Sequence, residues 1–272
     1  MPCLRTMPCR RKRRRAMTHP TDPGRRRFLT RGLLAGGTLM LTGCDRLSRS
    51  DAMQPLFAAS EGLTQRAHRL LASREALARE YGPEDIAPTF RANGTTMPRE
   101  VDYLRLAAGD FRDWRLEVDG LVEQPQAFSL ADLRAMPART QITRHDCVEG
   151  WSCIGEWTGV VLGELLARVG VRDEAHFVVF HCADRYGGGE RYYESLDLRE
   201  ALHPQTLLAY GLNGGDLPIA NGAPLRLRAE RQLGYKMAKY VMRLELVASF
   251  AHLGRGRGGY WEDRGYRWWA GI

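Results

Sequence analysis

The stretch His145-Asp146-Cys147-Val148-Glu149-Gly150-Trp151-Ser152 decides the fold, together with Asn221-Gly222-Ala223-Pro224-Leu225-Arg226 further along the 272-residue chain. Residues 140–143 precede the first stretch and have the composition of a β-strand, so we expect this strand to deliver the Cys147 side chain into a cleft. The second stretch offers backbone amides, glycine and arginine, which are the groups that hold a phosphorylated cofactor. Together the two stretches predict a cofactor site in which a cysteine takes part.

The N-terminus carries the signals of an exported protein. Arg25-Arg26-Arg27-Phe28-Leu29 fits the twin-arginine export pattern, and the apolar run of residues 32–42 is too short to span a bilayer but suits a signal peptide. Leu41-Thr42-Gly43-Cys44 matches a bacterial lipobox, in which the cysteine becomes acylated. We therefore expect residues 1–44 to be a twin-arginine signal peptide with a lipobox, and the protein to be periplasmic with a lipid anchor at Cys44. A basic tail that leads into a short buried helix is the alternative.

The net charge of +8 lies mainly in this leader, and the rest of the chain is close to neutral. A nucleic-acid-binding protein would need a basic face on its folded body. The sequence indicates no such face, so nucleic acid is not an expected partner.

Three cysteines belong to the body of the protein: Cys147, Cys153 and Cys182. An odd number of cysteines in an oxidising compartment leaves at least one thiol unpaired or bound to a metal. The body has no Cys-x-x-Cys pair for a zinc ribbon and no Cys-x-x-Cys-His motif for a covalent haem. We therefore expect no haem.

Composition and periodicity divide the rest of the chain into three parts. Residues 45–89 are predicted to form a tether and then an amphipathic helix over residues 60–81, which ends before Gly82-Pro83. Residues 90–250 are predicted to form a single mixed α+β domain that opens with a loop over residues 90–98. Residues 251–272, rich in glycine and aromatic side chains, are predicted to be a tail packed on that domain.

Within the domain, hydrophobic periodicity and turn signals locate the elements. Ser129 is predicted to begin a short helix as its N-cap, with Asp132 at the capping-box position. Two further helices are expected over residues 163–169 and 195–210, the second interrupted near Pro204. The predicted strands cover residues 114–118, 140–143, 176–182, 225–228 and 240–247.

Three signatures, in this order, resemble the molybdopterin-binding domain of the sulfite oxidase family. The first is Cys147-Val148-Glu149-Gly150-Trp151-Ser152 with Trp157-Thr158-Gly159-Val160, the second combines residues 210–218 with residues 221–226, and the third is Gly234-Tyr235-Lys236-Met237-Ala238-Lys239. The resemblance covers roughly residues 90–247 and is nearest to the catalytic subunits of periplasmic protein-methionine-sulfoxide reductases. It implies the sulfite oxidase molybdopterin-binding fold and a molybdopterin cofactor with one molybdenum.

The same resemblance implies the site residue by residue. Cys147 matches the catalytic cysteine whose thiolate binds molybdenum, a soft ligand for that metal. Arg226 offers a bidentate fork to the terminal phosphate of the cofactor, and Lys239 adds a point charge. Thr96, Met97 and Cys182 depart from the residues of the reductase at those positions, so backbone contacts are expected at the first two. The full set of cofactor-binding positions is Asn93, Thr96, Met97, Cys147, Cys182, Asn221, Arg226, Met237, Ala238 and Lys239.

Further polar residues lie near these signatures in the sequence: His145, Asp146, Glu149 and Asp184. Oxygen-atom transfer is coupled to protons, so these side chains either assist proton transfer or hold their neighbours in place. His181, next to Cys182 on an apolar strand, is interpreted as a core histidine whose hydrogen bonds are satisfied.

Two classes of function fit these observations. The first is a molybdenum oxidoreductase that transfers an oxygen atom and two electrons. The second is a lipoprotein binding module on the same fold, without a cofactor and with a disulfide between Cys147 and Cys153. The intact Cys147, Asn221, Arg226 and Lys239 favour the enzyme, and export of the folded protein suits a cofactor inserted beforehand.

The residues after Cys147 indicate the substrate. Sulfite oxidases are expected to have a Gly-Asn-Arg-Arg run here that attracts an anion, whereas this chain has Val148-Glu149-Gly150-Trp151. We therefore expect reduction of a neutral S-oxide or N-oxide, either small or protein-bound. A sulfite dehydrogenase is the alternative, because arginines from elsewhere can converge on the site, with Arg144, Arg185 and Arg191 as candidates. Without a haem, the electrons must come from a separate redox partner, such as a membrane or periplasmic cytochrome.

Overall fold

The structure is a computed structural model that describes residues 50, 53–71, 73, 75–186 and 189–272. The chain divides into two compact units, Met1–Ser60 and Glu61–Ile272, and helix α2 (Gln54–Leu71) crosses the boundary between them. The twin-arginine motif, the apolar run of residues 32–42 and the lipobox cysteine Cys44 lie outside the described residues. Among the helices that are described, none has both the length and the apolar character that a bilayer crossing requires.

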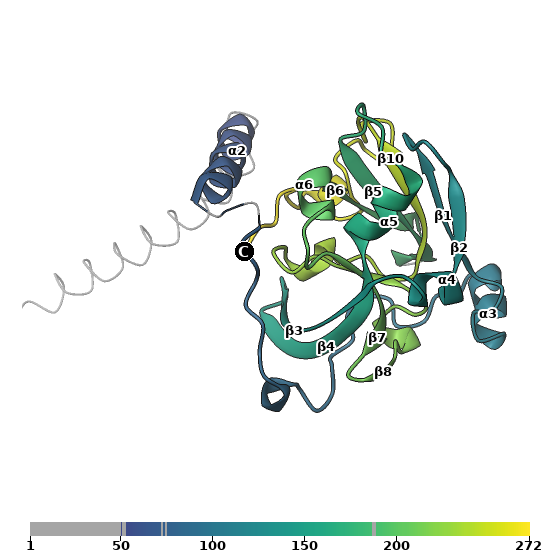
Figure 1. Ribbon diagram of the computed structural model, residues 1–272. Helices are drawn as coiled ribbons and strands as arrows, with labels where there is room; N and C mark the ends of the chain where they lie inside the picture. The colour runs from purple at the N-terminus through teal and green to yellow at the C-terminus, as the bar shows by residue number, and fades with distance from the viewer. Residues whose placement is uncertain (1–49, 51–52, 72, 74, 187–188) are drawn as a thin grey trace, which may run out of the picture. The chain divides into compact units, whose positions relative to one another are not determined.

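In the described part of the second unit, two five-stranded sheets carry the fold (Figure 1). The first sheet has the order β2-β1-β10-β5-β6, in which β1 and β10 are parallel and the other neighbours are antiparallel. The second has the order β3-β4-β7-β8, and β9 also pairs with β7.

The strand bounds follow the chain through both sheets. The first sheet contains β1 (Arg115–Gly120), β2 (Gln126–Ser129), β5 (Phe177–Arg185), β6 (Arg191–Asp197) and β10 (Val241–Val247). The second contains β3 (Ala138–Cys147), β4 (Trp151–Val161), β7 (Leu207–Leu212), β8 (Gly215–Asp216) and β9 (Arg226–Arg228).

Short helices connect these strands. Helix α4 begins as predicted, because the Ser129 hydroxyl accepts a hydrogen bond from the Asp132 backbone N–H at 3.1 Å. The α-helices of the second unit after α2 are α3 (Val101–Ala108), α4 (Leu130–Arg134), α5 (Leu162–Val169) and α6 (Leu198–Ala201). The 3-10 helices are η1 (Pro83–Asp85), η3 (Ile219–Asn221), η4 (Gly234–Lys236) and η5 (Glu262–Arg264).

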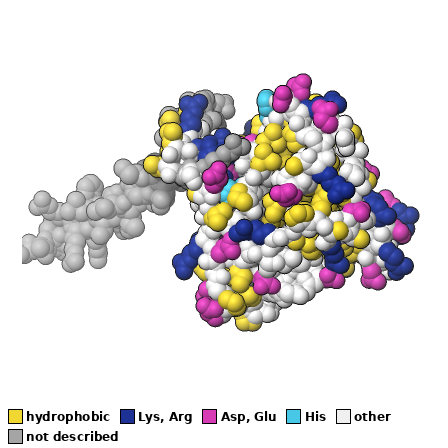
Figure 2. All heavy atoms as spheres, viewed as in Figure 1, with side chains coloured by type: hydrophobic (Ala, Val, Ile, Leu, Met, Phe, Trp, Pro, Cys, Tyr) yellow, Lys and Arg dark blue, Asp and Glu magenta, His cyan; other side chains and the backbone are white. Residues whose placement is uncertain are grey.

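The main hydrophobic core draws on both sheets and on α5. Helix α5 buries one face, at the i, i+3, i+4 and i+7 spacing of an amphipathic helix. Basic and acidic side chains are interspersed over the face of this unit that Figure 2 shows. The buried core includes Leu116 from β1, Phe180 from β5, Leu244 from β10, Val160 from β4, Leu208 from β7, and Leu162, Leu165, Leu166 and Val169 from α5.

A long hairpin of β3 and β4 places Cys147 at the end of its strand. The two strands pair in continuous antiparallel register from Ala138 opposite Val160 to Cys147 opposite Trp151. The turn between them is closed by a hydrogen bond from Gly150 N–H to the Cys147 carbonyl, and Gly150 adopts φ +85°, which favours glycine. The sequence therefore needs a glycine three residues after Cys147 to return the chain as β4.

The mixed α+β architecture is confirmed, but two predicted helices are wrong in extent, because each is helical over only part of its predicted range. The helix predicted over residues 60–81 ends at Leu71 in α2, residues 75–81 are not helical, and Glu80 forms a β-bridge with Thr143. The helix predicted over residues 195–210 is instead the end of β6, the short α6 and most of β7. Pairing of β7 with both β4 and β9 outweighs the helical propensity of Leu207-Leu208-Ala209.

Candidate active site

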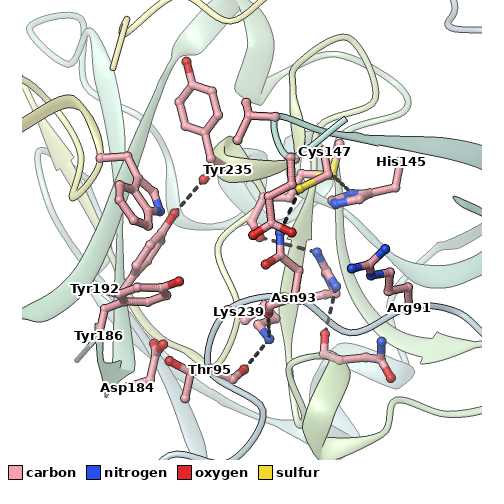
Figure 3. A pocket seen from close by; sticks show the side chains of 18 of the residues that line it. Arg91, Asn93, Thr95, His145, Cys147, Asp184, Tyr186, Tyr192, Tyr235 and Lys239 are labelled. Carbon is pink, nitrogen blue, oxygen red and sulfur yellow. Dashed lines mark hydrogen bonds between the residues drawn. The ribbon is translucent and has the colours of Figure 1, made fainter. Parts of the chain in front are cut away.

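One pocket gathers side chains from the ends of both sheets. It contains about 870 Å³ of empty space, part of which is open solvent. Cys147 comes from the end of β3, Asp184 from the end of β5 and Arg226 from the start of β9. Figure 3 shows Cys147, His145 and Arg91 on one side of this pocket, and Tyr186 and Tyr192 on the other.

The Cys147 thiol is held by the loop of residues 90–98. Asn93 Nδ2 donates a hydrogen bond to Cys147 Sγ at 2.9 Å (Figure 3), and Cys147 is 7% exposed. Burial raises the pKa of the Cys147 thiol, while the Asn93 hydrogen bond and the nearby Arg91 charge act to lower it. Burial therefore favours the neutral thiol of Cys147, and a positive charge placed at the sulfur would favour the thiolate.

Arg226 is a buried cation for which the described part of the chain shows no ion pair with a carboxylate. Its guanidinium donates to the Asn221 carbonyl at 2.9 Å and lies over the Trp157 ring at 4.8 Å. Burial, with the charge of neighbouring Arg228, lowers the pKa of Arg226 to about 9, so the group remains charged at neutral pH. A buried charge without a counter-ion is costly, and an anionic ligand in this pocket would remove that cost.

Lys239 connects the loop of residues 90–98 with Ala220, which also lines the pocket. Its Nζ donates to the carbonyls of Asn93, Thr95 and Ala220, the first at 2.6 Å and the last at 3.0 Å. Burial and the charge of Arg226 lower the pKa of Lys239 to about 7. An anion bound beside Arg226 would raise this pKa and favour the ammonium form.

His145 lies beneath the thiol as a neutral imidazole. Burial and the charges of Arg228, Arg226 and Lys239 hold the pKa of His145 well below its ordinary value. Its Nδ1 is 3.0 Å from Arg228 Nη1 and therefore accepts a hydrogen bond from that guanidinium. A Cβ atom at position 234 would collide with the His145 ring, which explains why glycine is needed there.

The acidic residues near the sequence motif divide into two groups. Glu149 and Asp184 line the pocket, and burial raises the pKa of Asp184. Asp146 is drawn away from the pocket, because it pairs with Arg144 at 2.9 Å and accepts a hydrogen bond from Ser152.

His181 is half-buried and bonded to Glu245 at 2.8 Å, so its hydrogen bond is satisfied, although it is more exposed than a core residue.

The structure brings six of the ten predicted cofactor-binding residues into the pocket lining. Met97 is 48% exposed, and Cys182 is buried in the main hydrophobic core. The residues that line the pocket are Asn93, Cys147, Asn221, Arg226, Met237 and Lys239, and those that do not are Thr96, Met97, Cys182 and Ala238.

The arginine candidates from the sequence do not line the pocket. Arg144 pairs with Asp146, Arg185 with Glu100, and Arg191 donates to the Ala183 carbonyl. Arg91 lines it instead and lies over the Trp151 ring at 4.8 Å. One arginine and the carboxylate of Glu149 thus share the entrance side of the pocket, so their charges offset each other.

Sequence reasoning missed the aromatic part of the lining. These side chains come from four separate segments: Tyr235 belongs to the third signature but was not assigned to the site, and the aromatic composition of the tail was the signal for Trp261 and Tyr266. The missed aromatic residues are Tyr186, Tyr192, Tyr235, Trp261 and Tyr266.

The cysteines exclude the disulfide of the alternative hypothesis. Cys147, Cys153 and Cys182 are all free in the described part of the chain. Cys153 faces a second hydrophobic cluster with Phe90 and Trp157. Cys147 faces the pocket.

Unpaired polar atoms test whether these residues suit a phosphorylated pterin. Asn221 Nδ2, Arg226 Nε and Asp184 Oδ1 are buried without a hydrogen-bond partner among the described residues, and all three residues line the pocket. Buried polar atoms are nearly always paired, so two donors and one acceptor here indicate a polar ligand. A pterin edge with a phosphate offers both acceptors and donors, and the residues therefore fit this group.

Comparisons with known proteins identify the family of this chain through a family model and a relative. Residues 104–252 match the family model described as the oxidoreductase molybdopterin binding domain. A relative from Azospira oryzae, provisionally named protein-methionine-sulfoxide reductase subunit YedZ1, is 39% identical over 252 residues, which is 92% of this chain and 88% of the relative. The sulfane dehydrogenase SoxCD from Paracoccus pantotrophus is 27% identical over 51% of this chain and 39% of its own, with a TM-score of 0.46. The chain belongs to the molybdopterin-binding oxidoreductase family and is an enzyme of the sulfite oxidase-like type.

Proposed function

We propose that this enzyme reduces S-oxides, with methionine sulfoxide, free or in proteins, as the substrate class. The balanced reaction takes one sulfoxide, two electrons and two protons, breaks the S–O bond and releases a thioether and water. The observation that carries this proposal is the meeting of the Asn93-held Cys147 thiol with the unpaired cation Arg226 and with Lys239 in one pocket. The name of the 39%-identical relative supports the choice of methionine sulfoxide.

The residues around the pocket would hold the cofactor at two ends. Cys147 Sγ is the metal ligand in this proposal, and Asn93 orients it through the hydrogen bond to sulfur. Arg226 and Lys239 hold the phosphate, and the free Asn221 Nδ2 donates to the same group or to the pterin edge. When bound, the molybdenum cofactor supplies the two-electron exchange of an oxygen atom.

The other predicted positions contribute less in this proposal. Thr96 and Met97 remain candidates for backbone contacts only, and Met237 lines the pocket beside His145, with Sδ 3.3 Å from Nδ1. Cys182 and Ala238 act as packing residues in the core, since both are buried there.

The charges around Cys147 favour a neutral substrate. Glu149 stands two residues from the proposed metal ligand and lines the pocket, and Arg91 offsets its charge rather than adding to a cationic site. A sulfite anion therefore gains little local attraction at the entrance. Oxidation of sulfite is the competing function, and it requires a pocket that prefers an anion to a neutral substrate.

Electrons would come from a separate protein, such as a membrane or periplasmic cytochrome, and the name of the relative as a subunit supports such a partner. Export by the twin-arginine route and a lipid on Cys44 would place the enzyme beside that partner. Cys44→Ala should move the protein from the membrane fraction to the soluble periplasm, because a multiply acylated cysteine anchors stably. Retention of this variant in membranes would contradict the lipid anchor.

The test of function compares two reactions on the same molybdenum-replete protein. Reduction of N-acetylmethionine sulfoxide is followed with reduced viologen, and sulfite oxidation with an artificial electron acceptor. We expect kcat/KM for the sulfoxide to exceed that for sulfite by at least about 100-fold, since a missing ion pair costs a few kcal/mol. Efficient sulfite oxidation with slow sulfoxide reduction would overturn the proposal.

A further inference from the structure

The C-terminal tail reaches the pocket from beyond the part of the chain that matches the family model. The match ends at residue 252, whereas Trp261 and Tyr266 both line the pocket. Trp261 is half-buried and Tyr266 is 39% exposed, so the two rings lie where the pocket meets solvent. This segment therefore borders any substrate that enters.

Five of the aromatic side chains that line the pocket form what we call the aromatic wall: Tyr186, Tyr192, Tyr235, Trp261 and Tyr266. Trp261 stacks on Tyr266 with ring centroids 5.1 Å apart, and Tyr186 meets Trp261 edge-on at the same separation. Tyr235 packs edge-on against Tyr266, also at 5.1 Å. Figure 3 shows Tyr186, Tyr192 and Tyr235 across the pocket from Arg91 and His145.

Two hydroxyl groups of the aromatic wall are bonded to the backbone. Tyr192 Oη donates to the Tyr235 carbonyl at 2.6 Å, and Tyr235 Oη donates to the Arg267 carbonyl at 2.6 Å. These bonds fix the two rings relative to the tail and leave their carbon surfaces to line the pocket. The aromatic wall thus offers ring surface on the side opposite the proposed metal ligand.

A buried ion pair holds the tail at this place. Lys236 follows Tyr235 and Glu262 follows Trp261, and Lys236 Nζ is 2.6 Å from Glu262 Oε1. Lys236 also pairs with Glu194 of β6, and the three side chains are each no more than 1% exposed. Tyr235 and Trp261 are therefore each adjacent in the chain to one member of a buried ion pair. This ion pair fixes the spacing of their rings.

We propose that Trp261 and Tyr266 of the aromatic wall determine specificity by binding the organic group of the S-oxide, with Glu262 as a positioning residue. This inference rests on the proposed function. Aromatic rings attract thioether sulfur and the polarised methyl groups beside it, and their negative faces repel anions. The aromatic wall therefore selects the alkyl side chain of methionine sulfoxide and disfavours a small anion.

The test uses the molybdenum-replete full-length enzyme and two neutral substrates. N-acetylmethionine sulfoxide presents a long organic group, and dimethyl sulfoxide presents only methyl groups. In Trp261→Leu we expect the ratio of their kcat/KM values to fall about fivefold, mainly through KM, since an aromatic contact contributes about 1 kcal/mol beyond area burial. Calorimetric binding of the product N-acetylmethionine should weaken by a similar factor, and Trp261→Phe should restore most of both.

The control is Trp269→Leu, in the same tail. Trp269 packs on His68 and Arg69 and is absent from the pocket lining, so its removal disturbs the tail without removing a wall ring. An equal fall of the ratio in this control would overturn the inference, because it would show a general effect of tail folding. If Trp261→Leu lost molybdenum, the same comparison on Tyr266→Leu would decide, since the Tyr266 side chain is more exposed.

The two proposals fail in different ways. An unchanged ratio in Trp261→Leu and Tyr266→Leu, with an active wild type, overturns the specificity role and leaves S-oxide reduction standing. A wild type that reduces neither sulfoxide overturns the proposed function and this inference together.

Discussion

Asn93 donates its side-chain amide to the Cys147 thiol at 2.9 Å, while Lys239 holds the Asn93 carbonyl at 2.6 Å. Asn93, in the loop of residues 90–98, is thus hydrogen-bonded both to Cys147 and to Lys239. Movement of Lys239, which we propose holds the cofactor phosphate, would shift Asn93 and its hydrogen bond to Cys147 Sγ. Cofactor binding at Lys239 should therefore affect the position of the Cys147 thiol.

Asn93→Ala should lower the molybdenum content or kcat by about 10- to 100-fold, the usual cost of removing a group that orients a metal ligand. Molybdenum analysis and sulfoxide turnover of the purified variant measure this. Ser129→Ala is the control, because it removes the N-cap of α4 and should cost about 1 kcal/mol of stability with full metal content. Equal metal content and turnover in Asn93→Ala and wild type would count against the role of Asn93.

Two neighbouring arginines should respond in opposite ways. Arg228 has a buried bidentate partner in Glu230, whereas Arg226 has no carboxylate partner among the described residues. Arg228→Met should destabilise the cofactor-free protein by about 3–5 kcal/mol, because Glu230 is left buried and unpaired. Arg226→Met should leave that stability within about 1 kcal/mol or raise it, yet lower the molybdenum content.

Chemical denaturation of the cofactor-free variants and metal analysis of the loaded ones check this pair. A strongly destabilised Arg226→Met protein would show that Arg226 is a structural cation. Full molybdenum content in Arg226→Met would place the phosphate elsewhere.

Acid should destabilise the protein through His203. Burial and the charge of Arg231 lower the pKa of His203 to about 4, and the neutral ring donates from Nε2 to the Ala76 carbonyl and accepts the Gln205 N–H at Nδ1. The unfolded chain takes up this proton near pH 6.5 and the folded chain only near pH 4. The contribution of His203 is therefore fully present above pH 6.5 and is lost as the pH falls towards 4.

His203→Gln removes this titration. Denaturation measured from pH 7 to pH 4 should show that the stability advantage of the wild type over this variant shrinks as the pH falls. An advantage that is constant across this range would contradict a neutral, buried His203.

The sequence predicts the elements that present Cys147 because the signals are local. The β-strand composition of residues 140–143 is sufficient for the strand that ends at Cys147, and Ser129 with Asp132 is sufficient for the start of α4, whereas the return as β4 was not predicted. The motif residues Asn221 and Arg226 reach the pocket because a short 3-10 turn and β9 carry them there.

Long-range contacts explain what the sequence could not predict. The apolar spacing of residues 60–81 continues past Leu71, but Gln205 binds the Ala78 backbone at 2.7 Å, and that part is not helical. Trp261 and Tyr266 line the pocket in a tail segment held by long-range contacts, among them the ion pair of Glu262 with Lys236. No periodicity within the tail encodes that ion pair.

The most direct test of the account compares Cys147→Ser with Cys153→Ser, two buried free thiols on the same hairpin. Cys153 lies in an apolar cluster away from the pocket lining, so Cys153→Ser should keep its molybdenum and its turnover. Cys147→Ser should fold but reduce N-acetylmethionine sulfoxide on the order of 100-fold more slowly or not at all, because a hydroxyl is a poor substitute for a soft thiolate ligand. Near-wild-type turnover of Cys147→Ser with bound molybdenum would contradict the account.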